Sequence, residues 1–290
     1  ILGGRSKIGK SWLVLDLAVS VALGRPTWGA VKTEQADVLY LSLEDTERRI
    51  KSRMASVLKS DPAPDNLYIA TTWPRAMVRN GEKVYQPDGI KKLYRFLKEN
   101  PSVKLVIIDT FAKFRTLWDK NHDIYQRDYY DVGILKELAD LLGIAVLLVH
   151  HHRKGGADDI GESLNGSVGL PGAADTLWSL TRKGFQGTLA VTGRDVGDGT
   201  YVLDFMKDGY WVMRGEKAEA EETDEQREVV DVLEELGEIT PAQLAQELGI
   251  NSDAARMRLN RLVERGIVRK VGRGKYCLAA DGVLNSPEEE

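Results

Sequence analysis

A glycine-rich phosphate-binding motif opens the chain. Residues 4–11 read Gly-Arg-Ser-Lys-Ile-Gly-Lys-Ser, which fits the pattern G-x-x-x-x-G-K-[ST]. The two glycines let the backbone turn tightly, so that successive N–H groups point inward at a phosphate. Lys10 would reach the β- and γ-phosphates of ATP, and the Ser11 hydroxyl would hold Mg²⁺. The predicted nucleotide-binding residues are Gly4, Ser6, Lys7, Ile8, Gly9, Lys10, Ser11 and Trp12.

This motif needs a strand before it and a helix after it. Residues 11–23 are mainly apolar and contain no Pro or Gly, which predicts a helix whose positive end faces the phosphates. Only Ile1 and Leu2 precede the loop as a strand. Because the chain also lacks an initiator Met, we expect that it was cut from a longer protein.

A second motif predicts the other metal-binding group. Residues 105–108 are apolar, and Asp109 follows them directly. A buried parallel strand here would deliver the Asp109 carboxylate beside the phosphate loop, where it orders Mg²⁺ through water. Ser11 and Asp109 are therefore the predicted metal residues. The alternative is a core strand that merely ends in an aspartate.

Hydrolysis would also need a carboxylate that polarises the attacking water. The position after Asp109 is Thr110, so this group must come from elsewhere. A strand predicted at residues 37–43 ends at Glu44, which we expect to be the catalytic carboxylate. Asp45 is the alternative, although it is better explained as the N-cap of a helix predicted over residues 47–58.

Three histidines at 150–152 follow another predicted buried strand, residues 144–149. Neighbouring side chains on a strand point to opposite faces, so the three cannot bind one metal ion together. We expect His150 or His151 to contact the γ-phosphate or the attacking water. The alternative is that the histidines only begin a solvated loop.

The composition of the 290 residues is that of an ordinary globular protein, with 42% hydrophobic and 29% charged residues and a net charge of -4. No apolar run approaches the ~18 residues that span a membrane, and no signal peptide is visible. Cys277 is the single cysteine, which excludes an internal disulfide and fits a cytoplasmic location.

Strands and helices alternate up to residue 150, which predicts an α/β fold with a mostly parallel sheet and helices on both faces. Residues 73–87 look irregular, and residues 112–128 look like a polar loop. Four further short strands are predicted at 175–180, 188–192, 201–205 and 210–213.

The charge pattern changes abruptly near the C-terminal end. Residues 216–238 carry 11 acidic and 2 basic side chains, whereas residues 239–278 carry 3 acidic and 8 basic ones. This change marks the start of a second, basic module. The predicted organisation is an ATPase domain at 1–214, a charged linker at 215–222, a winged helix-turn-helix domain at 223–280 and a disordered tail at 281–290.

The second module combines predicted helices at 223–236, 241–248 and 252–265 with a hairpin formed by 267–271 and 276–278. In the DNA-binding interpretation, Arg256 and Asn260, with Arg258 and Arg261, face the major groove. Arg273 and Lys275 would contact phosphates. The alternative is a module for protein interaction or assembly.

Taken as a set, the motifs resemble the RepA-like branch of the RecA/DnaB-type ATPases, which includes hexameric replicative helicases of plasmids and phages. The resemblance covers residues 1 to about 214. It rests on residues 4–12 (GRSKIGKSW), 41–45 (LSLED), 107–110 (IIDT), 149–154 (VHHHRK) and 166–176 (GSVGLPGAADT).

The resemblance implies a RecA-like homo-oligomer, a hexameric ring or a filament, with ATP at the subunit interface. It assigns catalysis to Glu44 and γ-phosphate sensing to His150 or His151. Arg194 matches the arginine that reaches the ATP of a neighbouring subunit, and Arg182 is its rival. The alternative role of Arg194 is a surface ion pair with Asp195 or Asp198.

In ring relatives, the loops after the Asp109 strand and the histidine strand line a central channel. Here they carry Lys113, Arg115, Arg153 and Lys154, which could hold a single DNA strand by its phosphates. Acidic residues in the second loop leave a solvated loop as the alternative. The expected function is ATP-driven translocation on single-stranded DNA as a replicative helicase of a mobile element. The alternative is a non-helicase NTPase, such as a loader, a recombinase-like protein or a regulatory switch.

Overall fold

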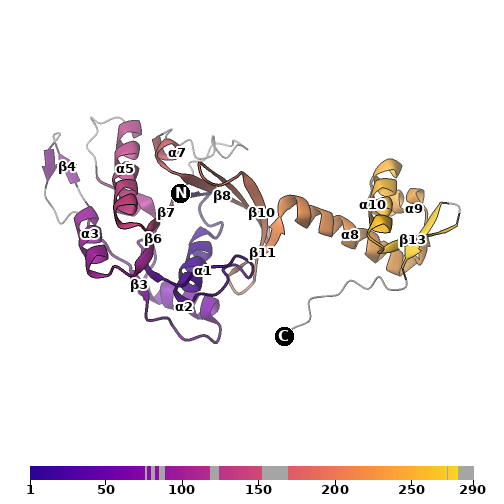
Figure 1. The fold of residues 1–290 in the computed structure, drawn as a ribbon, viewed down its shortest axis with the longest axis horizontal. Coiled ribbons are helices and arrows are strands. Elements are labelled where there is room, and N and C mark those ends of the chain that lie inside the picture. Colours follow the sequence, from indigo (N-terminus) through magenta and orange to yellow (C-terminus); the bar gives the residue numbers. More distant parts are fainter. Residues whose placement is uncertain are drawn as a thin grey trace. The chain divides into compact units, whose positions relative to one another are not determined.

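A computed structural model describes residues 1–75, 77–79, 82–84, 89–117, 124–151, 169–272 and 274–279. The chain divides into two compact units, Ile1–Glu216 and Lys217–Glu290 (Figure 1).

The first unit is built on a nine-stranded sheet with the order β11-β10-β9-β8-β1-β7-β6-β2-β3. From β8 through β1, β7, β6 and β2 to β3, each strand is parallel to the next. From β8 through β9 and β10 to β11, each strand is antiparallel to the next. The predicted α/β class with a mostly parallel sheet is therefore confirmed. The strands are β1 (Leu2–Gly3), β2 (Asp37–Ser42), β3 (Leu67–Ala70), β6 (Val103–Asp109), β7 (Ala145–Val149), β8 (Thr176–Lys183), β9 (Gln186–Gly193), β10 (Gly199–Phe205) and β11 (Trp211–Glu216).

Helices cover both faces of this sheet (Figure 1). Helices α1 (Lys10–Leu23) and α2 (Glu47–Leu58) pack on one face. Helices α3 (Gly89–Glu99), α4 (Phe111–Phe114) and α5 (Ile124–Leu142) pack on the other, and the short α7 (Gly169–Ala173) lies against α5. Val38 and Tyr40 of β2 enter one core, while Leu39 and Leu41 enter the other. A strand buried on both faces reads as a continuous apolar run for this reason.

This topology decides where the site must lie. Strands β1, β7, β6 and β2 are adjacent and parallel, so their C-terminal ends meet at one edge of the sheet. The phosphate loop follows β1, Glu44 follows β2, Asp109 ends β6 and His151 follows β7. Residues more than 100 positions apart therefore converge at that edge.

Two parts of the first unit differ from the sequence-based expectation. Residues 73–87 contain β4 (Met77–Arg79) and β5 (Glu82–Val84), which pair as an antiparallel hairpin. The Asn80-Gly81 dipeptide between them is a strong hairpin signal that the expectation of an irregular segment overlooked. Residues 112–128, which were expected to form a polar loop, instead include most of α4 and the first residues of α5, which begins at Ile124.

The second unit has the helices and the small sheet of a winged helix. Its elements are α8 (Lys217–Leu236), β12 (Glu238–Ile239), α9 (Pro241–Leu248), α10 (Ser252–Glu264), β13 (Val268–Gly272) and β14 (Lys275–Leu278). The sheet has the order β12-β14-β13. Thr240 and Gln243 form a capping box at the start of α9, and Asn251 caps α10 by accepting from the Ala254 N–H at 2.8 Å.

The helix predicted from residue 223 begins six residues earlier, at Lys217. Residues 217–222 are therefore helical, whereas a charged linker was expected there. No helix in the described part of the chain is long and apolar enough to cross a membrane.

Candidate active site

The phosphate loop connects β1 to α1 and has the backbone geometry of an anion site. Lys7 (φ 66°) and Gly9 (φ 105°) lie in the left-handed region. The Gly9 carbonyl accepts from the N–H groups of Trp12 (3.1 Å) and Leu13 (3.0 Å), which starts α1. This places the open N-terminus of α1 at the loop, where its dipole favours an anion. Ser6 and Lys7 are exposed, and Ile8, Ser11 and Trp12 are half-buried.

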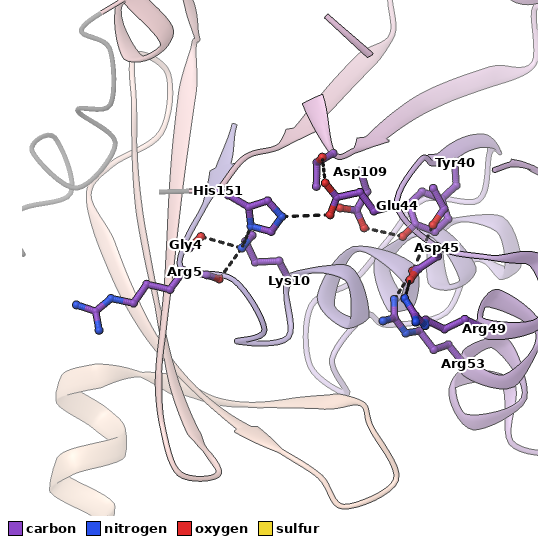
Figure 2. A network of polar contacts seen from close by, with 12 residues as sticks. Gly4, Arg5, Lys10, Tyr40, Glu44, Asp45, Arg49, Arg53, Asp109 and His151 are labelled. Carbon is purple, nitrogen blue, oxygen red and sulfur yellow. Dashed lines mark hydrogen bonds and ion pairs between the residues drawn. The ribbon is translucent and has the colours of Figure 1, made fainter. Parts of the chain in front are cut away.

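Lys10 is a buried cation at the centre of the site (Figure 2). Its ammonium donates to the carbonyls of Gly4 (2.8 Å) and Arg5 (2.7 Å) and to Nδ1 of His151 (3.1 Å). Burial lowers the pKa of Lys10 to about 8, although the carboxylates of Asp109 and Glu44 partly oppose this. The loop and the histidine together hold the ammonium inside the site.

Asp109 lies buried at the end of β6, beside Tyr40 of β2. Its Oδ2 accepts from the Tyr40 hydroxyl at 3.0 Å, and its Oδ1 is buried without a hydrogen-bond partner among the described residues. Burial raises the pKa of Asp109, while the Ser11 and Tyr40 hydroxyls act in the opposite direction. A buried carboxylate oxygen that still needs a partner, next to a serine hydroxyl, is the donor set that a hard cation such as Mg²⁺ takes. The residues present thus fit Mg²⁺.

Glu44 and His151 form the exposed side of the same cluster. Glu44 Oε1 accepts from the Thr110 hydroxyl at 2.9 Å, and its Oε2 lies 3.3 Å from Nε2 of His151. A neutral His151 with its proton on Nε2 satisfies both contacts, since Nδ1 can then accept from Lys10. The side chains of Glu44 and His151 are 41% and 34% exposed, so water reaches both.

The two histidine candidates differ in where they lie. The His151 imidazole bridges Lys10 and Glu44. The backbone N–H of His150 donates to the Leu2 carbonyl at 2.8 Å, which extends the β1–β7 pairing to the edge of the site. His152 lies outside the described residues.

Asp45 does not cap α2 as expected. The N-cap is Thr46, whose hydroxyl accepts from the Arg49 N–H at 3.4 Å. The Asp45 carboxylate instead pairs with the guanidinium groups of Arg49 (3.0 Å) and Arg53 (2.5 Å), away from Glu44 (Figure 2). Asp45 therefore anchors the start of α2 and leaves Glu44 to face the phosphate loop.

The two candidate arginine fingers lie at opposite ends of the sheet. Strand β8 runs parallel to β1, and Gly193 of β9 pairs with Thr176 at the start of β8. Arg194, the next residue, is thus at the edge remote from the phosphate loop, whereas Arg182 is near the loop end of β8. Arg194 is 61% exposed and pairs with Asp175 at 3.6 Å, not with Asp195 or Asp198 as the alternative supposed. The Arg182 guanidinium lies over the Phe205 ring at 4.6 Å.

The expected channel cations of the first unit have different surroundings. Lys113 is exposed on α4. Arg115 forms ion pairs with the buried carboxylates of Asp128 and Asp131, the second at 3.4 Å. These ion pairs join Arg115 to α5, and its contact with DNA stays a prediction. Arg153 and Lys154 lie outside the described residues.

The basic residues of the second unit also divide into two groups. Arg258 points to α8, where it pairs with Glu225 (3.1 Å) and Glu228 (2.9 Å), and its major-groove role stays a prediction. Arg261 approaches Glu225 at 3.5 Å. Arg256 is 60% exposed and lies 3.9 Å from Asp253.

Two polar candidates of this unit have partners of their own. Asn260 Oδ1 accepts from the Tyr276 hydroxyl at 3.3 Å, and Lys275 lies 3.4 Å from Glu238. Arg273 lies outside the described residues.

Sequence reasoning missed three residues of the site. Tyr40 sits in an apolar strand, where a buried hydroxyl needs a partner, and this was a usable signal. Thr110 was passed over because only a carboxylate was sought at that position. Trp211, whose Nε1–H donates to the Gly9 carbonyl at 3.0 Å, comes from 202 residues away and had no local signal.

Two family models match parts of the chain. A family model described as an AAA domain matches residues 1–157, and one described as a transcriptional regulator, AbiEi antitoxin, matches residues 227–279. No curated protein matches the chain.

Solved structures with similar folds include a DnaB-like replicative helicase, at 16% identity and a TM-score of 0.56 over 73% of this chain. The match covers 57% of that helicase chain, so this chain spans little more than half of its length. A RadB recombinase aligns at 13% identity and a TM-score of 0.45, over 72% of this chain and 89% of the recombinase. The first match shows the RecA/DnaB-type fold. Since the family match extends over more than half of the residues, the chain belongs to the AAA domain family of P-loop ATPases.

Proposed function

We propose that this chain is an ATP-hydrolysing DNA motor, a RepA-like replicative helicase of a plasmid, phage or other mobile element. The observation that carries the proposal is the convergence of Lys10, His151 and Glu44 on the phosphate loop, with Asp109 behind them. Each group has the chemistry and position that phosphoryl transfer requires.

Glu44 is the residue that orients the attacking water. The Thr110 hydroxyl holds one carboxylate oxygen, so the carboxylate has a fixed orientation. Its other oxygen faces His151 and is open to solvent. Lys10 binds the β- and γ-phosphates, and to do so its ammonium exchanges His151 for a phosphate oxygen. His151 thereby links occupancy of the γ-phosphate position to the Glu44 carboxylate.

Ser11 and Asp109 would hold Mg²⁺, which when bound neutralises charge on the phosphate oxygens. Within the chain, the Tyr40 hydroxyl fixes the Asp109 carboxylate so that its second oxygen stays directed into the site. The nucleotide and Mg²⁺ assignments both follow from this donor set.

Arg194 completes the site of a neighbouring copy in a homo-oligomer, which we propose to be a hexameric ring. Its position at the sheet edge remote from its own phosphate loop supports action in trans, since it cannot approach its own nucleotide. A cation at this place stabilises the charge that builds on the transferred group. DNA contacts are proposed for Lys113, Arg153 and Lys154 in the ring and for Arg256, Asn260, Arg273 and Lys275 in the winged helix.

The test is ATP hydrolysis with and without single-stranded DNA, measured for the parent chain and for Glu44→Gln. We expect single strands to stimulate the parent severalfold and the substitution to lower kcat by at least about 100-fold. The isosteric amide keeps the Thr110 contact, so ADP affinity should remain unchanged. Hydrolysis that ignores single strands would overturn the motor, and an active Glu44→Gln chain would overturn the role of Glu44.

A second candidate is a non-helicase NTPase that acts through its C-terminal unit, such as a loader or regulatory switch. Two observations favour it: the regulator-type family match over residues 227–279, and the ion pairs of Arg115 with Asp128 and Asp131, which compete with a DNA phosphate for this cation. Duplex DNA that binds the chain without raising ATP hydrolysis would select this candidate over the motor.

A further inference from the structure

Trp211 joins the last strand of the sheet to the phosphate loop. It is the first residue of β11, an edge strand, yet its side chain is completely buried. Its indole Nε1–H donates to the Gly9 carbonyl at 3.0 Å. That carbonyl also accepts from the N–H groups of Trp12 and Leu13 in the first turn of α1. A side chain from the last strand of the domain thus binds the backbone where the phosphate loop joins α1.

The fit around the ring is close on two sides. A Cβ added at Gly9 would lie 2.9 Å from the Trp211 ring, and one added at Gly187 of β9 would lie 2.5 Å from it. The Phe205 ring packs on the same indole with a centroid separation of 4.9 Å. The indole is therefore held between the loop and the antiparallel strands, and the hydrogen bond has a defined direction.

The peptide plane carries this constraint into the site. The Gly9 carbonyl and the Lys10 N–H belong to one planar trans unit, so they point in opposite directions. A donor that fixes the carbonyl also fixes where the Lys10 N–H points. This N–H is among the groups with which a phosphate-binding loop holds its anion. Gly9 has no side chain and a φ of 105°, so its own stereochemistry restrains this plane weakly.

We propose that Trp211 is a positioning residue for nucleotide binding: its indole N–H fixes the Gly9–Lys10 peptide so that the loop presents its N–H groups to the phosphates. This inference rests on the proposed function, because it concerns the same phosphate site. It adds a residue from β11 to the binding machinery.

The chain supplies a matched control in Trp28. This residue is also buried, and its Nε1–H also donates to a backbone carbonyl of α1, that of Leu13, at 3.1 Å. The Leu13 carbonyl lies within the helix and does not face the phosphates. Loss of either indole N–H removes one hydrogen bond from a buried carbonyl, but only the bond of Trp211 ends at the loop.

The experiment measures the Kd for ADP by titration calorimetry on the full chain, together with the melting temperature without nucleotide. We expect Trp211→Phe to weaken ADP binding about tenfold, because the Lys10 N–H would lose its fixed orientation and with it an ordered hydrogen bond to a charged phosphate. Trp28→Phe should lower the melting temperature about as much as Trp211→Phe does. It should leave the Kd for ADP within about twofold of the parent. If Trp211→Phe does not fold, 3-benzothienylalanine at position 211 keeps the ring shape and still removes the N–H.

A spectroscopic readout separates positioning from bulk stability. In chain labelled with 5-fluorotryptophan, the Trp211 fluorine resonance should shift when ADP is added, and the Trp28 resonance should not.

Three results would overturn the inference alone: an unchanged Kd without the Trp211 N–H, an equal loss of affinity in Trp28→Phe, or a Trp211 resonance that ignores ADP. A parent chain that binds no ADP would instead overturn the proposed function, and the inference with it.

Discussion

At the scale of the residue, the fold constrains the charge of Lys10. Its ammonium is buried, and the carbonyls of Gly4 and Arg5 accept from it. Burial outweighs the attraction of Asp109 and Glu44, so the pKa falls to about 8. A lysine with this pKa can lose its proton under mildly alkaline conditions, unlike an ordinary surface lysine.

This pKa gives a pH dependence for nucleotide affinity. Phosphate anions favour the charged lysine, so bound nucleotide raises the pKa of Lys10, and binding takes up a proton wherever the free chain has lost one. Affinity for ADP should thus be constant below pH 8 and fall above it, by up to about tenfold per pH unit.

Titration calorimetry with ADP from pH 7 to 9.5 tests this expectation, and proton uptake can be read from buffers of different ionisation enthalpy. The Lys10→Arg chain is the control. Its guanidinium stays charged, so its affinity should be weaker but level with pH in this range. A parent affinity that is equally level up to pH 9.5 would show that Lys10 keeps its proton in the free chain.

At the scale of elements, the junction of β2 and α2 decides where Glu44 points. The side chain of Asp45 is 7% exposed and binds Arg49 and Arg53, while Thr46 caps the helix. These contacts hold the first turn of α2 against the end of β2. Glu44, between the strand and this anchor, is left to contact Thr110 and His151.

Removal of the Asp45 carboxylate should therefore cost both stability and activity. We expect Asp45→Ala to lower the free energy of unfolding by about 2 kcal/mol, because Arg53 would keep a half-buried charge without its partner. The matched control is Asp61→Ala, which breaks the more exposed pair with Arg25 and should cost less than about 1 kcal/mol. Urea unfolding gives both values, and equal losses in the two variants would contradict the anchoring role.

The elements that could be predicted from sequence are those with strong local signals. Helix α2 and strand β2 lie within a residue of expectation, because a continuous apolar run and a polar turn delimit them. The start of α8 was missed because residues 217–222 are mostly charged and were read as a solvated linker. Those residues are good helix formers, and the Lys217–Glu221 pair at 3.7 Å supports the added turns.

The residues of the site also differ in how far the sequence could predict their positions. Glu44, Asp109 and the histidines could be placed together because parallel strands end at one edge of a sheet, which needs only the strand order. The contacts of Arg115 and Trp211 depend on how distant side chains pack. Arg115 pairs with Asp128 and Asp131, and no repeating pattern in the sequence between them indicates this contact.

At the scale of the whole molecule, the position of Arg194 bears on how the site is completed. Arg194 lies remote from its own phosphate loop, exposed and held by Asp175, whereas Arg182 is near the loop end of its strand. If Arg194 acts on a neighbour, the chemistry belongs to an interface between copies. Such a heterologous contact closes into a ring or extends into a filament.

Mixing two inactive chains tests this arrangement. Arg194→Ala should lower ATP hydrolysis at least about 100-fold, as Glu44→Gln does. In a random mixture, an intact Glu44 from one variant meets an intact Arg194 from the other at about a quarter of heterologous interfaces, so hydrolysis should return to about a quarter of the parent rate. Lys10→Ala mixed with Glu44→Gln is the control, since Lys10 and Glu44 serve the same nucleotide within one chain and gain nothing from mixing. If the Arg194→Ala mixture stays inactive while both chains still assemble, then Arg194 does not act in trans, and the trans contact must be sought in another residue.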